Sequence, residues 1–186
     1  MSHPLQNCSL FLIGMMGVGK TTVGQELAKQ LNYRFFDTDN LIERVAGKPI
    51  PEIFATDGEE AFRKLESQVL GQLSAQTRST IATGGGIILK AENWSYLRHG
   101  IVVWLDIPAP VLYHRLGADS SRPLLQTPDP LQTLQELCDR RRSLYAQADL
   151  HLTLSGAEPP EQVAEQILNE LPKILKPKSK ANTHLN

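Results

Sequence analysis

Cysteine is scarce in this chain. Cys8 and Cys138 are the only two among 186 residues, which excludes a disulfide framework or a cysteine-built metal cluster. No apolar run approaches the ~20 residues that a membrane-spanning helix needs. The formal net charge is only -1, so no overall field attracts nucleic acid or an anionic membrane. Residues 1–7 also lack the basic-then-apolar pattern of an export signal. We therefore expect a cytoplasmic protein with two packed, reduced thiols and with neither nucleic acid nor a membrane as a partner.

The length of the chain and the order of its patterns suit one compact α/β domain over residues 1–172. Hydrophobic residues make up 41% of the chain, which allows a sizeable core. Expected strands occupy residues 9–13, 34–36, 80–82, 101–105 and 150–154. Expected helices occupy residues 20–31, 39–46, 50–56, 58–74, 91–97, 108–116, 131–146 and 160–171. This alternation predicts a parallel sheet with helices on both faces, in which ligands bind beyond the carboxyl ends of the strands.

The most informative motif is GMMGVGKT at residues 14–21, which fits the phosphate-binding pattern G-x-x-x-x-G-K-[ST] at every fixed position. It lies between an expected buried strand and an expected helix, a context that a chance glycine-rich turn does not explain. Backbone N–H groups of the loop and the helix N-terminus favour a polyphosphate. Lys20 can reach the outer phosphates, and the Thr21 hydroxyl can ligate Mg²⁺. The sequence therefore predicts a nucleoside triphosphate site.

Two carboxylates follow the second expected strand. Asp37 and Asp39 come directly after an apolar pair, at the sheet edge that also carries the phosphate loop. In an extended chain, residues two apart point the same way. One carboxylate could then hold Mg²⁺ through water, and the other could orient or deprotonate a hydroxyl group. The alternative is a helix N-cap at Thr38 or Asp39, a position that these residue types favour.

Three successive glycines, Gly84, Gly85 and Gly86, end the third expected strand. Because they carry no side chains, they leave backbone N–H groups bare and permit a ligand to approach closely. A flexible turn into the next segment is the alternative.

Arg141 lies on the apolar stripe of the helix expected at residues 131–146. The stripe consists of Leu134, Leu137, Cys138 and Tyr145. Burying an unpaired guanidinium is costly, so Arg141 needs an anion from the protein or from a ligand. Arg140 and Arg142 lie off the stripe and are expected in solvent.

Arg63 is a second candidate for anion binding, on the helix expected at residues 58–74. Glu66 follows it by three residues, and an ordinary ion pair within the helix is the alternative role. Two arginines can otherwise grip one carboxylate through bidentate hydrogen bonds.

The stretch 117–130, GADSSRPLLQTPDP, is polar, interrupted by proline and longer than a usual connection, which is typical of active-site lids. Arg122 at its centre could close over a transferring phosphoryl group; the alternative is a surface arginine. Arg115, at the end of the preceding helix, could stack on an adenine ring. Residues 173–186 are basic with few apolar side chains, so we expect a disordered, solvated tail.

Together these motifs resemble the shikimate kinase family of small P-loop kinases, from residue 10 to about residue 171. The resemblance rests on residues 14–22, 37–39, 62–63, 83–86, 122–125 and 141–145. It implies a three-layer α/β P-loop kinase fold, with a five-stranded parallel sheet flanked by helices, a substrate-binding segment after the second strand, and a lid. It also implies an enzyme that phosphorylates the 3-hydroxyl of shikimate with MgATP, on the route to the aromatic amino acids, and that is a monomer as a rule.

The resemblance implies a role for each motif residue. Lys20, Asp39 and Arg122 would be catalytic, with Asp39 contacting the reacting hydroxyl. Residues expected to bind ATP are Gly17, Val18, Gly19, Lys20, Thr21, Thr22, Arg115, Arg122 and Pro160. Residues expected to bind shikimate are Asp39, Arg63, Gly84, Gly85, Gly86 and Arg141. Mg²⁺ would be held directly by Thr21 and supported by Asp37.

Other functions of the same fold make different predictions. A gluconate kinase would use the same loop and lid with another acceptor site, whereas Asp39, Arg63 and Arg141 suit a compact hydroxy acid. A nucleoside monophosphate kinase has no use for two carboxylate-binding arginines. A non-catalytic regulator would show damage among the catalytic positions, and all of them are intact. A nucleotide-gated switch would need a partner surface, which a sequence does not reveal.

Overall fold

The computed structural model of the chain describes residue 5 and residues 7–117 and 127–175. Its centre is one five-stranded sheet in the order β2-β3-β1-β4-β5, in which every pair of neighbours is parallel. The strands are β1 (Leu10–Ile13), β2 (Arg34–Asp37), β3 (Ser79–Ala82), β4 (Ile101–Asp106) and β5 (Leu150–Thr153). The predicted parallel sheet is confirmed, and each strand ends within one residue of its expected bounds.

Burial explains why these segments form strands. All residues of β1 and β3 are buried, and so are the first five of β4. Continuous apolar runs of this kind are typical of central parallel strands that are covered on both faces. The edge strand β5 instead alternates buried and exposed residues, which is typical of a half-buried strand.

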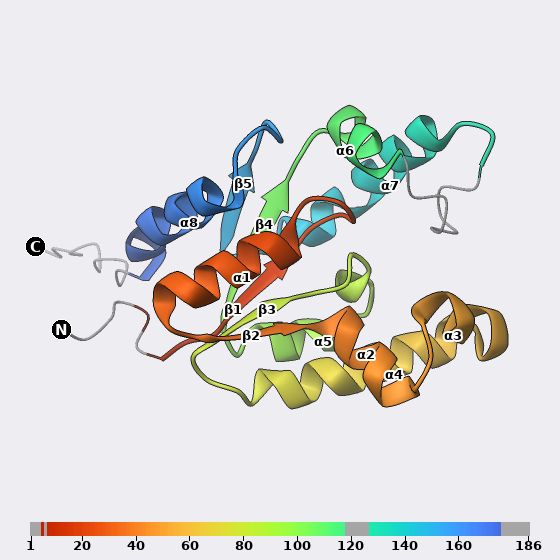
Figure 1. Ribbon diagram of the computed structural model, residues 1–186, viewed down its shortest axis with the longest axis horizontal. Helices are drawn as coiled ribbons and strands as arrows, with labels where there is room; N and C mark the ends of the chain where they lie inside the picture. Colours follow the sequence, from red (N-terminus) through yellow and green to blue (C-terminus); the bar gives the residue numbers. More distant parts are fainter. Residues whose placement is uncertain (1–4, 6, 118–126, 176–186) are drawn as a thin grey trace, which may run out of the picture.

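Helices cover both faces of the sheet (Figure 1). They are α1 (Lys20–Leu31), α2 (Thr38–Ala46), α3 (Ile50–Thr56), α4 (Gly58–Ser74), the 3₁₀ turn η1 (Ile87–Leu89), α5 (Ala91–Leu97), α6 (Ala109–Leu116), α7 (Pro130–Tyr145) and α8 (Pro160–Leu175). Helix α1 packs against α8, and α4 packs against α5, which gives the three layers expected from the resemblance.

The chain leaves β1 at the point where the strand order reverses. The strands that follow first fill one side of β1, with β3 and β2, and then the other side, with β4 and β5. A crevice opens at such a point beyond the carboxyl ends of the strands. Figure 1 shows α2, α3 and α4 on one side of this end of the sheet, and α6 and α7 on the other.

The end of α8 differs from the expectation. The helix passes through Pro172 and ends at Leu175 rather than at residue 171. Lys173, expected in the tail, is helical, and its Nζ donates to Glu170 at 2.6 Å. The rest of the tail, at 176–186, and the greater part of the expected lid, at 118–126, lie outside the described residues.

Within residues 7–117 and 127–175, no helix is long and apolar enough to cross a membrane. Cys8 and Cys138 are both free and partly buried, in agreement with the expected packed thiols.

Candidate active site

The phosphate-binding loop joins β1 to α1 and depends on glycines with positive φ. Gly17 has φ 77° and Gly19, the N-cap of α1, has φ 100°, a region that other L-residues rarely adopt. A Cβ at Gly17 would also lie 2.9 Å from Leu116. The backbone therefore turns tightly at the N-terminus of α1, where its N–H groups and the helix dipole favour an anion.

Lys20 is held by the loop itself. Its side chain is buried, and its Nζ donates to the carbonyl oxygens of Gly14 and Met15, both at 2.8 Å. These bonds compensate the desolvation of the ammonium group. They also hold the charge at the mouth of the loop, where outer phosphates would arrive.

Asp37 and Thr21 are joined across the cleft. The Thr21 hydroxyl donates to Oδ2 of Asp37 at 2.8 Å. Hydroxyl and carboxylate oxygens beside a phosphate loop fit Mg²⁺, which takes its other ligands from phosphates and water. In the described part of the chain, no group of three or more His, Cys, Asp or Glu residues could hold a metal ion.

Two expectations about Asp37 and Asp39 were wrong in their geometry. The helix N-cap is neither Thr38 nor Asp39. It is Asp37, whose Oδ1 accepts from the N–H groups of Asp39 and Asn40 at 3.0 and 3.3 Å. Asp39 therefore lies in the first turn of α2 rather than in extended chain. The two carboxylates nevertheless line the same cleft, because helix and strand meet there.

The glycine triplet makes room for charged side chains of the protein. A Cβ at Gly84 would lie 2.7 Å from Oδ1 of Asp39 and 3.0 Å from Oε1 of Glu66, and one at Gly86 would lie 2.7 Å from Nη2 of Arg63. Gly86 adopts an ordinary negative φ of -98°. Gly86 is therefore required because a larger side chain would collide with Arg63. The sequence predicted only that the glycines leave their backbone N–H groups open to a ligand.

Arg63 forms the ion pair within α4 that the sequence offered as an alternative. Its Nη1 lies 2.9 Å from Oε2 of Glu66, and its Nη2 lies 3.4 Å from Oε1 of Glu59. The guanidinium also lines the cleft. The ion pair thus orients Arg63 toward the site instead of removing it from the site.

Glu66 was predicted only as a possible ion-pair partner of Arg63. It is completely buried, and its Oε1 has no hydrogen-bond partner among the described residues. Burial raises the pKa of Glu66, although the neighbouring Arg63 lowers it in part. The sole sequence signal was its i,i+3 spacing from Arg63.

Arg141 is buried on α7, as its place on the apolar stripe predicts, with 7% of its surface exposed. Its Nη1 donates to the carbonyl oxygen of Gly85 at 3.3 Å. Among the described residues, no carboxylate forms an ion pair with it. Arg140 and Arg142 are exposed as expected, and Arg142 lies 3.3 Å from Asp106.

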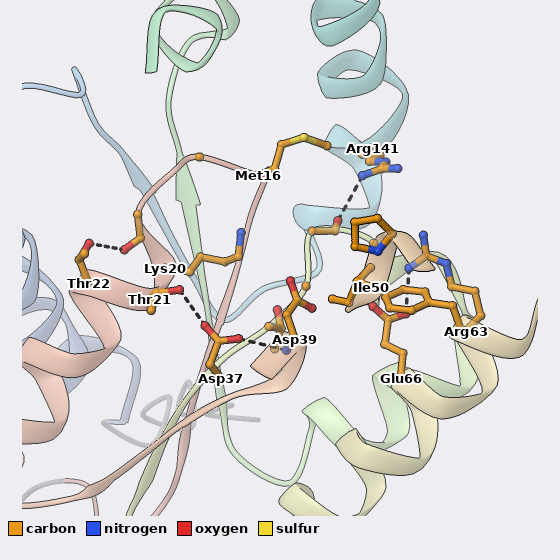
Figure 2. A pocket seen from close by; sticks show the side chains of 18 residues that line it. Met16, Lys20, Thr21, Thr22, Asp37, Asp39, Ile50, Arg63, Glu66 and Arg141 are labelled. Atoms are coloured by element: carbon orange, nitrogen blue, oxygen red, sulfur yellow. Dashed lines mark hydrogen bonds and ion pairs between the residues drawn. The ribbon is translucent and has the colours of Figure 1, made fainter. Parts of the chain in front are cut away.

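These residues line one cleft of about 550 Å³, a volume that suits a small molecule. Figure 2 shows Lys20, Thr21 and Asp37 at one end, and Arg63, Glu66 and Arg141 at the other, with Asp39 between them. The cleft brings together all the predicted residues of the phosphate, metal and acceptor sites except Val18 and Arg122. Its lining includes Gly17, Gly19, Lys20, Thr21, Thr22, Asp37, Asp39, Arg63, Gly84, Gly85, Gly86 and Arg141. Arg122 lies outside the described residues.

A second hollow, of about 210 Å³, lies on the other side of the phosphate loop. Val18, Gly19 and Thr22 line it together with Arg115 and Pro160. The adenine-flanking pair expected from the sequence is thus brought together, although Arg115 is hydrogen-bonded to backbone carbonyls of the protein.

The apolar wall of the cleft was not predicted, although one of its residues, Phe62, belongs to the motif at residues 62–63. Ile50, Pro51 and Phe62 line it from α3 and α4, and Phe62 also packs on Phe54 with ring centroids 4.7 Å apart. The signal was weak, because apolar residues on short amphipathic helices serve the core far more often than a site.

Comparison with known proteins shows the family of the chain. A family model described as shikimate kinase matches residues 16–172. A shikimate kinase from a Nostoc species is 53% identical over 176 residues, which are 95% of this chain and 97% of the relative. A solved structure of shikimate kinase from Acinetobacter baumannii in complex with shikimate is 39% identical with a TM-score of 0.83, and the match covers 89% of this chain and 93% of that chain. A gluconokinase from Sinorhizobium meliloti, at 17% identity and a TM-score of 0.56 over 91% of this chain and 94% of that one, shares the fold alone. This chain belongs to the shikimate kinase family.

Proposed function

We propose that this protein transfers the γ-phosphate of MgATP to the 3-hydroxyl of shikimate, giving shikimate 3-phosphate and ADP for aromatic amino acid biosynthesis. It is an ATP-dependent phosphotransferase with an alcohol acceptor, as its family is. The observation that carries the proposal is the order of groups along one cleft. A phosphate loop lies at one end, two arginines lie at the other, and a carboxylate lies between them.

The phosphate end would bind ATP through the backbone of residues 17–22. Lys20 already sits at the mouth of the loop, and it would exchange its carbonyl partners for phosphate oxygens as the nucleotide enters. Thr21 would ligate Mg²⁺ directly, and Asp37 would support it through water. When bound, Mg²⁺ neutralises charge on the phosphates and helps to align them.

The acceptor end would bind shikimate through its carboxylate and hydroxyls. Arg63 and Arg141 approach the cleft from α4 and α7, so that one planar carboxylate could receive both guanidinium groups. The Gly84–Gly86 backbone would lie against the ring. A buried Arg141 with no carboxylate partner in the described part of the chain supports this role, because the substrate would supply the missing anion.

Asp39 lies between the two ends and would contact the reacting hydroxyl, orienting it and accepting its proton. The remaining chemistry of phosphoryl transfer is alignment, charge stabilisation and exclusion of water. Arg122, on the expected lid at 117–130, would stabilise the transferring group, and lid closure after acceptor binding would suppress hydrolysis of ATP.

The second hollow would receive the adenine ring, flanked by Arg115 and Pro160. Its lining is largely apolar, with Val18, Val23 and Ile107 among the contributors, as a planar base requires. We further propose that the enzyme acts as a monomer in the cytoplasm, where its two free thiols stay reduced.

Release of ADP from MgATP tests the function directly, with shikimate, gluconate or no acceptor in parallel reactions. We expect rapid release with shikimate alone. Release with gluconate instead would support the proposed phosphoryl transfer but contradict the assignment of shikimate as the acceptor. Equal release in all three reactions, or none, would move the protein to a hydrolytic or a non-catalytic nucleotide-binding role.

A further inference from the structure

We propose that Glu158 is a positioning residue for the nucleotide, because its carboxylate fixes the loop that closes the adenine hollow and, through that loop, fixes Arg115. The inference rests on the proposed use of the second hollow for the base of ATP. Glu158 belongs to the loop between β5 and α8 and lines that hollow.

Both oxygens of the Glu158 carboxylate are engaged by the loop backbone. Oε1 accepts from the N–H of Ser155, and Oε2 accepts from the N–H of Gly156, each at 2.9 Å. Hydrogen bonds to an ionised acceptor are stronger than neutral ones. Two of them from adjacent residues define the path of the chain over residues 155–158.

The fixed loop in turn holds Arg115. Gly156 has φ 90°, and its carbonyl oxygen accepts a hydrogen bond from Nη2 of Arg115. The Nη1 of Arg115 donates to the carbonyls of Gly17 and Val18 at 3.3 and 3.4 Å. One guanidinium therefore bridges the β5–α8 loop and the phosphate loop, both of which line the hollow.

The carboxylate charge is secure at any pH at which the enzyme would work. Hydrogen bonds from backbone N–H groups, that of Ser155 first, lower the pKa of Glu158 to about 2. The carboxylate therefore stays ionised, and the link from Glu158 through Gly156 and Arg115 to the phosphate loop is already present in the structure. It sets the width of the hollow before a nucleotide arrives.

A preformed hollow lowers the ordering cost of binding without touching the transferring phosphate. A substitution that weakens ATP binding equally in the ground state and in the transition state raises KM and leaves kcat unchanged. Glu158 should therefore affect the KM for ATP alone, whereas a residue with a merely structural role would change kcat and both KM values together as the fold weakened.

The test compares Glu158→Gln and Glu158→Ala with Glu161→Gln, an exposed acidic residue in the first turn of α8. The glutamine keeps the shape of the side chain but turns an NH₂ donor toward one backbone donor, and it also keeps the proposal testable if the alanine variant folds poorly. For each variant, ADP affinity is measured by calorimetry without any acceptor, and KM for ATP, KM for shikimate and kcat are measured by ADP release.

We expect both Glu158 variants to weaken ADP binding and to raise the KM for ATP, by about fivefold for Glu158→Gln and by up to about thirtyfold for Glu158→Ala, as the loss of one and of two hydrogen bonds implies. The KM for shikimate and kcat should stay within about twofold, and Glu161→Gln should match the parent. Unchanged ADP affinity in both variants overturns the proposal, as does an equal loss for both substrates. If the parent binds ADP but shikimate does not increase its release of ADP from MgATP, the proposed function is wrong. The calorimetric ADP affinities of the variants still test the role of Glu158 in that case.

Discussion

Tyr145 and Arg141, one turn apart on α7, donate hydrogen bonds to the same acceptor, the carbonyl oxygen of Gly85. The Tyr145 hydroxyl lies 2.6 Å from that oxygen, and Nη1 of Arg141 lies 3.3 Å from it. Burial raises the pKa of Tyr145 to about 12, so the hydroxyl stays a donor. These two hydrogen bonds connect α7 to the glycine triplet and place the guanidinium of Arg141 beside the proposed shikimate site.

Replacing Tyr145 with phenylalanine should weaken acceptor binding selectively. The change removes one hydrogen bond to Gly85 and leaves the ring packed against Trp104, at a centroid distance of 5.7 Å. A lost bond of this kind costs about 1 kcal/mol, so we expect the KM for shikimate to rise roughly fivefold with the KM for ATP unchanged. Steady-state kinetics with Tyr96→Phe as the control checks this. Equal changes in the two KM values would show that Tyr145 serves the fold as a whole.

Replacing Arg141 with alanine should have a larger effect in the same direction. A desolvated partner of a bound carboxylate contributes about 3 kcal/mol, which is roughly a hundredfold in affinity. Calorimetric titration with shikimate and with ADP separates the two sites, and the exposed neighbour Arg140→Ala is the matched control. Loss of both affinities to the same extent would refute the assigned role.

Much of the fold could be predicted from the sequence because its signals are local. The buried apolar runs of β1 and β4 and the periodic stripe of α7 each follow from residues that are close together in the chain. The phosphate loop could be predicted for the same reason, since its glycines, Lys20 and Thr21 are contiguous. The extension of α8 past Pro172 was missed, because packing rather than propensity decides where a helix ends.

The acceptor site could be predicted only in part, because its geometry is set by contacts between distant segments. Nothing in the local sequence shows that Gly86 leaves space for Arg63, or that Gly84 faces both Asp39 and Glu66. The capping role of Asp37 also depends on where α2 begins, which sequence patterns locate to within a few residues at best. The types of residue in the acceptor site could therefore be predicted from the sequence, but their positions relative to one another could not.

Gly86→Ala tests the requirement for space. The φ of -98° at this position suits alanine, but the added methyl would lie 2.7 Å from Nη2 of Arg63. The flexible arginine should move rather than the backbone, so we expect a folded protein with about tenfold weaker shikimate binding, since about 1.4 kcal/mol corresponds to that factor. Gly71→Ala on α4, where the nearest atom lies at an ordinary 3.4 Å, is the control. Unchanged shikimate affinity would show that Arg63 does not need its present position.

Glu66→Gln should change how stability depends on pH. Burial raises the pKa of Glu66 above its ordinary value of 4.5, so the folded protein holds this proton at a pH where the unfolded chain has released it. The contribution of Glu66 to the free energy of unfolding therefore falls as the pH rises above about 4.5 through the folded pKa. Urea unfolding between pH 4 and pH 8 should show the parent losing stability relative to Glu66→Gln as the pH rises. If the parent instead gains free energy of unfolding relative to Glu66→Gln as the pH rises, the ion pair with Arg63 has a larger effect on the pKa of Glu66 than burial has.

Asp39→Asn and Asp37→Asn should separate two roles that the sequence left open. Asparagine keeps the shape of each side chain, and at position 37 it is also a good N-cap, so α2 should remain intact in both variants. We expect Asp39→Asn to lower kcat by a hundredfold or more, because a general base or hydroxyl anchor usually contributes about 10²–10⁴. The Mg²⁺ requirement of this variant should change little.

Asp37→Asn should instead raise the Mg²⁺ concentration needed for half-maximal activity and recover most of kcat at high Mg²⁺. Titrations of activity against Mg²⁺ at saturating substrates measure both effects. Full activity of Asp39→Asn would remove it from the chemistry, and an Asp37→Asn variant with a normal Mg²⁺ dependence would leave capping of α2 as the role of Asp37.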